Sequence, residues 1–563
     1  MAVSLYAIAI SVIAILLITR WITGSRVLKS NENRPPLVPF WVPFVGNAVE
    51  LILFPERFLD YARTATFEKG YFALLLLGRK LNVIYQPDIA YHLLSQTTDG
   101  HDAQFDFSSV SATVRRNAFG LQKLPDETME RILRELRKAY IQNLKGHGED
   151  TLLSKTLGEW SQTLPDLMSF NDSLVDQMPW ERASKTLPLV EGKENTESAD
   201  TNLFALIQSF VMHTVLQHLF GVSFPEAVPT LQEDIQMFSN AFLLLSLGLP
   251  RWAPIPRVTS AHIARHRMLN QLTSYHLAVA RYRAGEDEPS SSEWRDVSDV
   301  SELVESIHRT MFNNVSPNSS GNATQLAARA AASESLLLIW SISCKLSGII
   351  YWTLFRIVAI EGLADRIRSG SSKVVIATQP PPLMSMYPPP RLNFMVDDVF
   401  PTSPLLASSI LESFRVYARS WLFRQVRKTT TFPSKGGDRS SQISTRSGEL
   451  VAIPVFMSSL GHSTSTPKRH WVAERFEEEL NDPHPPPFNE GFQPSENGKC
   501  PGIDIAQSGV AAFVAGFLSL WDITPVDNQG HQLPKPTQGL CIPRPRGDTR
   551  VRISKRNLPI AEF

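Results

Sequence analysis

The sequence has 563 residues, of which 43% are apolar and 20% are charged. Its 55 Lys and Arg residues balance its 55 Asp and Glu residues, so the net charge gives no reason to expect a phosphate-binding surface. Three cysteines cannot form a disulfide framework, and no Cys-x-x-Cys pair is present, which argues against a cystine-rich secreted protein and a structural zinc site. We therefore expect a protein with a sizeable hydrophobic core and no nucleic-acid partner.

The amino-terminal segment 1–19 carries no charged side chain and is rich in Ile, Leu, Val and Ala. A helix of this length spans about 28 Å, close to the hydrocarbon thickness of a bilayer. Basic residues follow the run and none precedes it, which favours a retained anchor with the following chain in the cytoplasm. The alternative is a signal peptide, but a basic leading region and a small-residue cleavage site are not evident. We predict a transmembrane anchor over 1–22 and a basic, Pro-rich hinge over 23–50.

The segment from Leu51 to Ile367 has mostly helical periodicity, and the nearly uncharged stretch 336–360 predicts a long helix through the core. Residues that favour strands gather at 71–85, 429–432, 450–454 and 549–554. The fold class is therefore mainly α with a small antiparallel β part. We expect one domain over 51–563, with polar surface insertions near 285–322, 378–390 and 433–448, because low apolar content cannot offset the entropy of ordering.

Two patterns in the carboxyl-terminal half place reactive or charged residues in informative settings. Cys500 lies in a glycine-flanked loop before a predicted apolar helix, where a lowered thiol pKa would favour a metal-binding or nucleophilic thiolate. A small buried thiol is the alternative interpretation. Glu412 and Arg415 share one helix face between apolar neighbours, which favours a buried ion pair over a solvated one.

The order of these features resembles the cytochromes P450, the haem-thiolate superfamily, over nearly the whole chain. A long central helix is followed by Glu412-x-x-Arg415, a strand region, Trp471-Val-Ala-Glu-Arg475-Phe476, and Cys500-Pro-Gly before a helix. The central helix is most similar to the branch that contains sterol 7α-hydroxylases and prostacyclin synthase. The amino-terminal run resembles the anchor of microsomal members. The resemblance implies a cytochrome P450 fold preceded by one transmembrane helix, with haem (iron protoporphyrin IX) as cofactor.

The same resemblance assigns roles to particular residues. Cys500 would be the axial thiolate ligand of the haem iron. Arg424 would pair with a haem propionate, and Lys499 would supply a basic contact beside the cysteine. The three remaining residues would form a structural network behind the haem: Glu412, Arg415 and Arg475.

The sequence departs from the family pattern in two places. The central helix has Lys345 and Leu346 where most members have an acid or amide followed by Thr, and a Leu side chain cannot relay a proton. The candidates near the oxygen-activation position are therefore Ser343, Lys345 and Ser347, none of which is assigned a catalytic role. Around the cysteine, the places that usually hold Phe, Gly and a basic residue hold Gln493, Glu496 and Gly498.

The resemblance implies a monooxygenase, an oxidoreductase that acts on paired donors and incorporates molecular oxygen. We expect it to hydroxylate a lipophilic small molecule, with electrons from an NADPH-cytochrome reductase. It would be a single-pass protein of the endoplasmic reticulum membrane with a cytoplasmic catalytic body, in secondary metabolite biosynthesis and of fungal origin. The alternatives are a haem-thiolate isomerase or dehydratase that does not activate dioxygen, and a non-catalytic, decayed homologue.

Overall fold

The computed structural model of this protein describes most of the chain. The described residues are 2–28, 34–66, 69–86, 89–90, 93, 104–106, 108–144, 151–189, 197–286, 294, 296–315, 323–381, 388–395, 399–418, 421–433, 442–454, 470–481, 503–526, 534–537 and 542–560.

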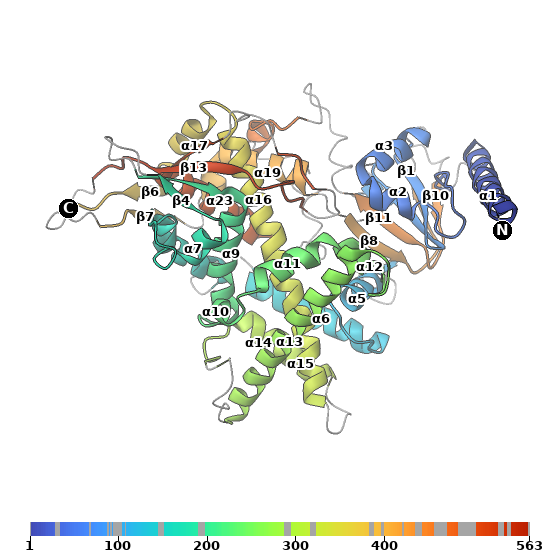
Figure 1. Cartoon of the computed structure of the whole chain (residues 1–563), viewed down its shortest axis with the longest axis horizontal. Coiled ribbons are helices and arrows are strands. Elements are labelled where there is room, and N and C mark those ends of the chain that lie inside the picture. Colours follow the sequence, from blue (N-terminus) through green and yellow to red (C-terminus); the bar gives the residue numbers. More distant parts are fainter. Residues whose placement is uncertain are drawn as a thin grey trace.

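Helices make up most of the described structure (Figure 1). Their bounds are α1 Ala2–Leu28, α2 Ala48–Leu53, α3 Pro55–Ala65, α5 Ser108–Asn117, α6 Asp126–Leu144, α7 Leu152–Thr163, η1 Leu164–Asp166, α8 Pro179–Ala183, α9 Leu203–Phe220, α10 Phe224–Ala227, α11 Leu231–Asn240, α12 Phe242–Ser246, α13 Pro256–Ala284, α14 Glu302–Val315, α15 Ala323–Ser341, η2 Ile342–Leu346, α16 Ser347–Val358, α17 Leu363–Ser371, α18 Val399–Thr402, α19 Pro404–Tyr417, α21 Glu477–Asn481 and α23 Ile503–Leu520.

The strands are short and lie in several small sheets. Their bounds are β1 Tyr71–Leu76, β2 Arg79–Ile84, β3 Phe105–Asp106, β4 Leu187–Leu189, β5 Ser198–Asn202, β6 Val375–Thr378, β7 Arg391–Phe394, β8 Trp421–Val426, β9 Thr430–Pro433, β10 Gln442–Thr445, β11 Leu450–Pro454, β12 Trp521–Pro525 and β13 Arg550–Lys555. All four regions predicted to contain strands do contain them.

The largest sheet has the order β1-β2-β11-β8-β3 and packs beside α2 and α3 at the end of the molecule near α1 (Figure 1). A tight turn joins β1 to β2, and both of its residues, Leu77 and Gly78, have positive φ, as such hairpins require. The sheets are mainly antiparallel, as predicted, and the pair β2–β11 is parallel. These two strands are far apart in sequence, so no hairpin forces them to run in opposite directions.

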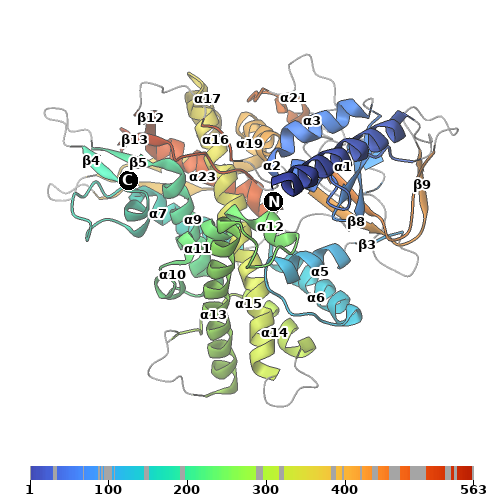
Figure 2. The same ribbon diagram turned by 45° about the vertical axis from the view of Figure 1, so that its right-hand side comes forward.

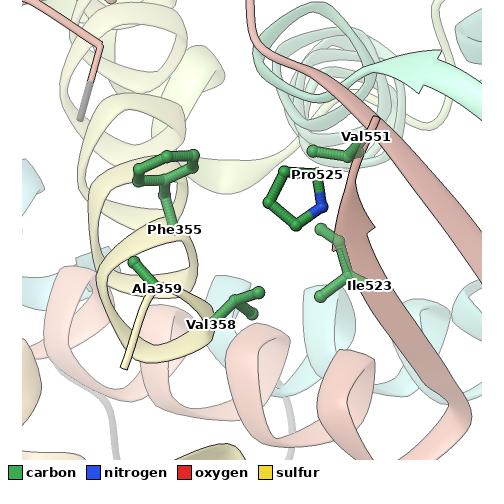
Figure 3. A pocket seen from close by; sticks show the side chains of 6 residues that line it. All are labelled: Phe355, Val358, Ala359, Ile523, Pro525 and Val551. Atoms are coloured by element: carbon green, nitrogen blue, oxygen red, sulfur yellow. The ribbon is translucent and has the colours of Figure 1, made fainter. Parts of the chain in front are cut away.

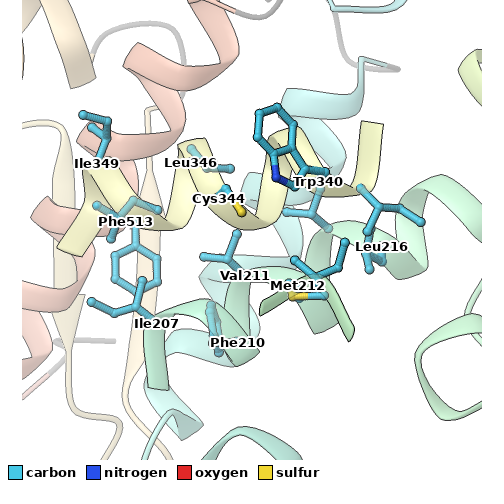
Figure 4. Packing of buried hydrophobic residues seen from close by; sticks show 14 of the residues in the cluster. Ile207, Phe210, Val211, Met212, Leu216, Trp340, Cys344, Leu346, Ile349 and Phe513 are labelled. Carbon is cyan, nitrogen blue, oxygen red and sulfur yellow. The ribbon is translucent and has the colours of Figure 1, made fainter. Parts of the chain in front are cut away.

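The central helix, made of α15, η2 and α16, crosses the middle of the body as predicted (Figures 1 and 2). It packs along α9 and α23, and Phe210 of α9 meets Phe513 of α23 with ring centroids 5.7 Å apart (Figure 4). Both Ala323–Val358 and Leu203–Phe220 are long and apolar enough to cross a membrane, but each is largely buried inside the protein. Their apolar composition is therefore that of core helices.

The structure corrects the prediction of a polar insertion over 285–322. The helix α14 lies inside this range and packs on α15 and α6, with Leu303, Val304, Ile307 and Met311 buried. Apolar residues at helical spacing provide a buried face even though the flanking sequence is polar. The range 433–448 likewise contains β10, which pairs with β9, and 378–390 begins where β6 ends.

The apolar helix α1 lies at the periphery, next to the sheet that contains β1 (Figure 1). It extends to Leu28, beyond the predicted anchor boundary at residue 22. Arg20 Nη1 donates to the carbonyl of Pro39 at 2.6 Å, so the end of α1 is attached to the Pro-rich hinge. Large apolar side chains of α1 are exposed, among them Ile10, Ile13, Leu17 and Trp21.

The helical core also contains buried charged and titratable groups. Arg115 of α5 forms a two-pronged ion pair with Glu334 of α15 at 2.8 and 2.9 Å, and Tyr140 donates to the same carboxylate. His276 and His308 stack between α13 and α14, with ring centroids 5.6 Å apart. Burial, and then the nearby charge of Arg283, lowers the pKa of His308 to about 4.

Candidate functional site

Glu412, Arg415 and Arg475 come together in a buried network. The Glu412 side chain is fully buried in α19, and its carboxylate accepts from Arg415 Nε at 2.6 Å and Nη2 at 2.8 Å. Arg475 Nε lies 3.0 Å from the same carboxylate, and the backbone N–H of Val472 donates to it at 3.0 Å. One carboxylate therefore joins two guanidinium groups and one backbone amide.

This network holds the segment 470–476 against α19. The indole N–H of Trp471 donates to Ser413 Oγ at 3.1 Å, and the backbone N–H of Phe476 donates to Ser408 Oγ at 2.9 Å. Local sequence placed Glu412 and Arg415 on one helix face, but the approach of Arg475 depends on how the chain returns from β11. The result is a rigid support in the part of the chain that precedes Cys500.

Cys500 and Lys499 lie outside the described residues, so the structure does not place them. The helix α23 begins at Ile503, three residues after Cys500 in the sequence. A methyl group at Gly509 of α23 would lie 3.9 Å from Leu346 of the central helix. The second turn of α23, around residue 509, therefore lies against the π-helical segment η2.

Arg424 lies on β8 with only 7% of its surface exposed. Burial and the neighbouring charge of Arg137 lower its pKa, while Asp106 raises it. A buried guanidinium on β8 is compatible with the predicted pairing of Arg424 with a haem carboxylate, and that pairing stays a prediction.

The candidates on the central helix do not share one environment. Ser343 is buried and its hydroxyl accepts from Gln208 Nε2 of α9 at 3.0 Å, so it faces α9. Ser347 is also buried, and its hydroxyl has no hydrogen-bond partner within the described part of the chain. Lys345 is exposed, and its Nζ lies 5.7 Å from the centroid of the Trp340 ring.

The π-helical segment η2 spans Ile342–Leu346 and contains Ser343 and Lys345. Single π-helical turns inside α-helices occur often at functional sites. No sequence signal predicted this segment. Leu346 is buried, and its side chain has no donor or acceptor that could relay a proton.

Trp340 belongs to an aromatic cluster that joins α11, α12 and α15 to the turn after α5. Its ring stacks on Phe242 with centroids 4.2 Å apart, and its edge meets Phe119 at 5.8 Å. Phe238 completes the cluster, 5.6 Å from Phe119. These rings form a wall beside the central helix that sequence reasoning did not identify.

A small apolar cavity lies at the far end of the central helix, between α16 and the strands β12 and β13 (Figure 3). Its volume of about 10 Å³ is the room of a single water molecule. It is lined by Phe355, Val358, Ala359, Ile523, Pro525 and Val551. The cavity is therefore a packing defect and too small to hold a substrate.

Comparisons with known proteins agree with this arrangement. No family model matches the sequence. The chain is 22% identical to a cytochrome P450 monooxygenase, fsoE, of Humicola fuscoatra over 402 residues, which cover 65% of this chain and 64% of that protein. It is 21% identical to cytochrome P450 7B1 of Mus musculus over 458 residues, 80% of this chain and 74% of that protein. The chain thus spans just under two thirds of the first relative's length.

Among solved structures, the chain is similar to retinoic acid-bound cyanobacterial CYP120A1, with a TM-score of 0.60 and 14% identity. The superposition covers 93% of this chain and 99% of that one. The core-crossing central helix and the buried Glu412 network are part of a fold that is similar to that of a haem-thiolate protein. The chain is similar to the cytochromes P450 in sequence and in fold, and this similarity implies a haem cofactor.

Proposed function

We propose that this protein is a haem-thiolate monooxygenase that oxidises a lipophilic small molecule. The observation that carries the proposal is the position of Cys500, three residues before a helix that packs on the central helix. The amino end of a helix favours a thiolate over a thiol, because its unpaired N–H groups stabilise negative charge. The solved neighbour is bound to retinoic acid, which supports a lipophilic substrate.

The roles of this chain's residues follow from their surroundings. Cys500 would hold the iron, and Arg424 would pair with a carboxylate of the haem. Bound haem would supply the oxygen chemistry, and the thiolate ligand favours O–O cleavage. The network around Glu412 would keep the thiolate loop in position, and the aromatic cluster around Trp340 would keep water away from an apolar substrate.

A carbon monoxide spectrum of the full chain tests the proposal. The reduced protein treated with carbon monoxide should show the absorption band of thiolate-ligated haem, and Cys500→Ala should abolish it. The matched control is Cys344→Ala, which removes a buried thiol of the central helix and should keep the band. Absence of the band in the wild-type protein would contradict the assignment and favour a non-catalytic homologue.

We also propose an isomerase or dehydratase as the second candidate, on the basis of the central helix. Ser343 is engaged by Gln208, and Leu346 cannot relay a proton, so the usual acid and Thr have no direct counterpart here. Such an enzyme would rearrange an already oxygenated substrate. Turnover in the absence of NADPH and reductase supports this candidate, whereas strict NADPH dependence supports the monooxygenase.

The proposed setting is the endoplasmic reticulum membrane, with α1 as a single anchor, the body on the cytoplasmic side and a reductase as electron donor. The exposed apolar side chains of α1 support this part of the proposal. Alkaline carbonate extraction of cell membranes tests it, because an integral anchor stays in the pellet. A variant that lacks 1–28 should move to the soluble fraction. A role in secondary metabolism, in a fungus, completes the proposal, and the relative from Humicola fuscoatra supports only its fungal part.

A further inference from the structure

We propose that Lys345 is the anchor for a carboxylate on the substrate, and that the substrate is therefore an apolar acid rather than a neutral lipid. This inference rests on the proposed function, because it takes one face of the central helix to be a wall of the substrate site. It assigns the substrate class from the position of a single cation.

The first step is the direction in which Lys345 projects. Each residue of a helix is turned by about 100° from the last, so residues two positions apart lie on opposite sides. Ser343 faces α9 through Gln208, and Ser341 and Lys345 therefore project away from α9. Both are solvent-accessible, as are Leu337 and Ile342, although most of the helix is buried. We call these four residues the exposed face of the central helix.

The second step is the apolar surface next to the ammonium group. Lys345 and Trp340 are five residues apart, a spacing that α-helical geometry does not align, and the π-helical segment between them brings the two side chains together. Trp340 continues into Phe242 and Phe119 by ring contacts. A cation at the edge of an aromatic wall is complementary to a molecule with one anionic end and an apolar body.

The third step is the charge balance. None of the ion pairs formed within the described part of the chain includes Lys345. A second cation near η2, Arg544, donates to the neutral amide oxygen of Asn240. Burial raises the pKa of the Cys344 thiol, whereas the charges of Arg544 and Lys345 lower it, so both cations act on this part of the central helix. Lys345 is the more exposed of the two and therefore the more accessible to a bound anion.

The Lys345 position normally carries an acid or amide in the family that this sequence resembles, and an acid there would repel a carboxylate. A lysine reverses the sign of the charge at the wall. Ammonium–carboxylate bonds are about twice as strong as neutral hydrogen bonds. Discrimination against a neutral analogue should therefore reach roughly tenfold or more.

The test measures binding rather than turnover. The full-length holoprotein is titrated by isothermal calorimetry with dodecanoate and with methyl dodecanoate, which share the apolar chain and differ in charge. We expect the wild-type protein to bind the acid at least roughly tenfold more tightly than the ester. Lys345→Met should bring the ratio near one, while Lys345→Arg should keep most of it. The control Lys373→Met removes an exposed lysine between α17 and β6 and should leave the ratio unchanged.

Two results overturn the inference: equal affinity of the wild-type protein for the two probes, including no binding of either, or an unchanged ratio in Lys345→Met. Circular dichroism of each variant establishes that it is folded, and Lys345→Gln replaces Lys345→Met if that variant is not. The carbon monoxide band separates this inference from the proposed function. If the protein shows the carbon monoxide band but binds the acid and the ester equally, the inference alone is refuted. If it prefers the acid through Lys345 but lacks the band, the haem-thiolate assignment alone is refuted.

Discussion

Replacement of Glu412 by Gln is the most direct test of the buried network. The substitution keeps the shape of the side chain and removes the charge that compensates Arg415 and Arg475. The Glu412 carboxylate receives Nε and Nη2 of Arg415, Nε of Arg475 and the backbone N–H of Val472. A glutamine has one acceptor oxygen, and its NH₂ group would point a second donor at the guanidinium groups.

The expected loss is large relative to the stability of a typical protein. Removal of one member of a buried ion pair costs about 3–5 kcal/mol, because a charge stays buried without compensation. The side chains of Arg415 and Arg475 are only 5% and 8% exposed, so water can compensate little of this. The free energy of unfolding of a folded protein is about 5–15 kcal/mol, so Glu412→Gln should remove a substantial part of it.

The assay is urea unfolding followed by far-UV circular dichroism, together with the haem content of the purified protein. The matched control is Glu474→Gln, which neutralises a carboxylate of the same segment whose partner is Arg366 at 2.7 Å. The side chains of Glu474 and Arg366 are 44% and 56% exposed, so the control substitution should lower the free energy of unfolding by less than about 1 kcal/mol. If the two variants lose similar stability, within about 1 kcal/mol of wild type, the reasoning about burial is refuted.

Three further predictions address other parts of the fold. Glu334→Gln leaves the buried Arg115 guanidinium without its carboxylate and should cost about 3–5 kcal/mol by urea unfolding; a loss under about 1 kcal/mol would contradict this. The pKa of His308 is lowered to about 4 from 6.5, so its contribution to stability is complete above pH 6.5 and is lost as the pH falls towards 4. The loss reaches up to about 3 kcal/mol, and His308→Phe should flatten this part of the pH profile of unfolding; an unchanged profile would argue against it. Gly46→Ala should destabilise the β1 region, because Gly46 has a φ of 65° and an added Cβ would lie 2.1 Å from the carbonyl oxygen of Leu75; a melting temperature equal to that of wild type would show that the site tolerates a side chain.

Several parts of this protein could be predicted from local sequence. The central helix, the strand regions and the shared face of Glu412 and Arg415 follow from residue periodicity, which depends only on helix and strand geometry. The assignment of Cys500 stays a prediction, because this residue lies outside the described part of the chain. The same local reasoning failed over 285–322, where a polar composition concealed the amphipathic face of α14.

Other features depended on contacts between segments that are distant in the chain. Arg475 reaches Glu412 only because the segment after β11 returns to α19, and Arg115 meets Glu334 only because α5 lies across α15. The parallel pairing of β2 with β11 has the same origin.

Lys345 illustrates the division most clearly. The sequence determined that a cation occupies the middle of an apolar helix, where burial would be costly. The tertiary structure decided that this cation is exposed: α9 covers the side of the helix that bears Ser343, and the π-helical segment brings Lys345 to Trp340. Periodicity fixes the spacing of side chains along one helix, but the packing of neighbouring elements determines which side is buried.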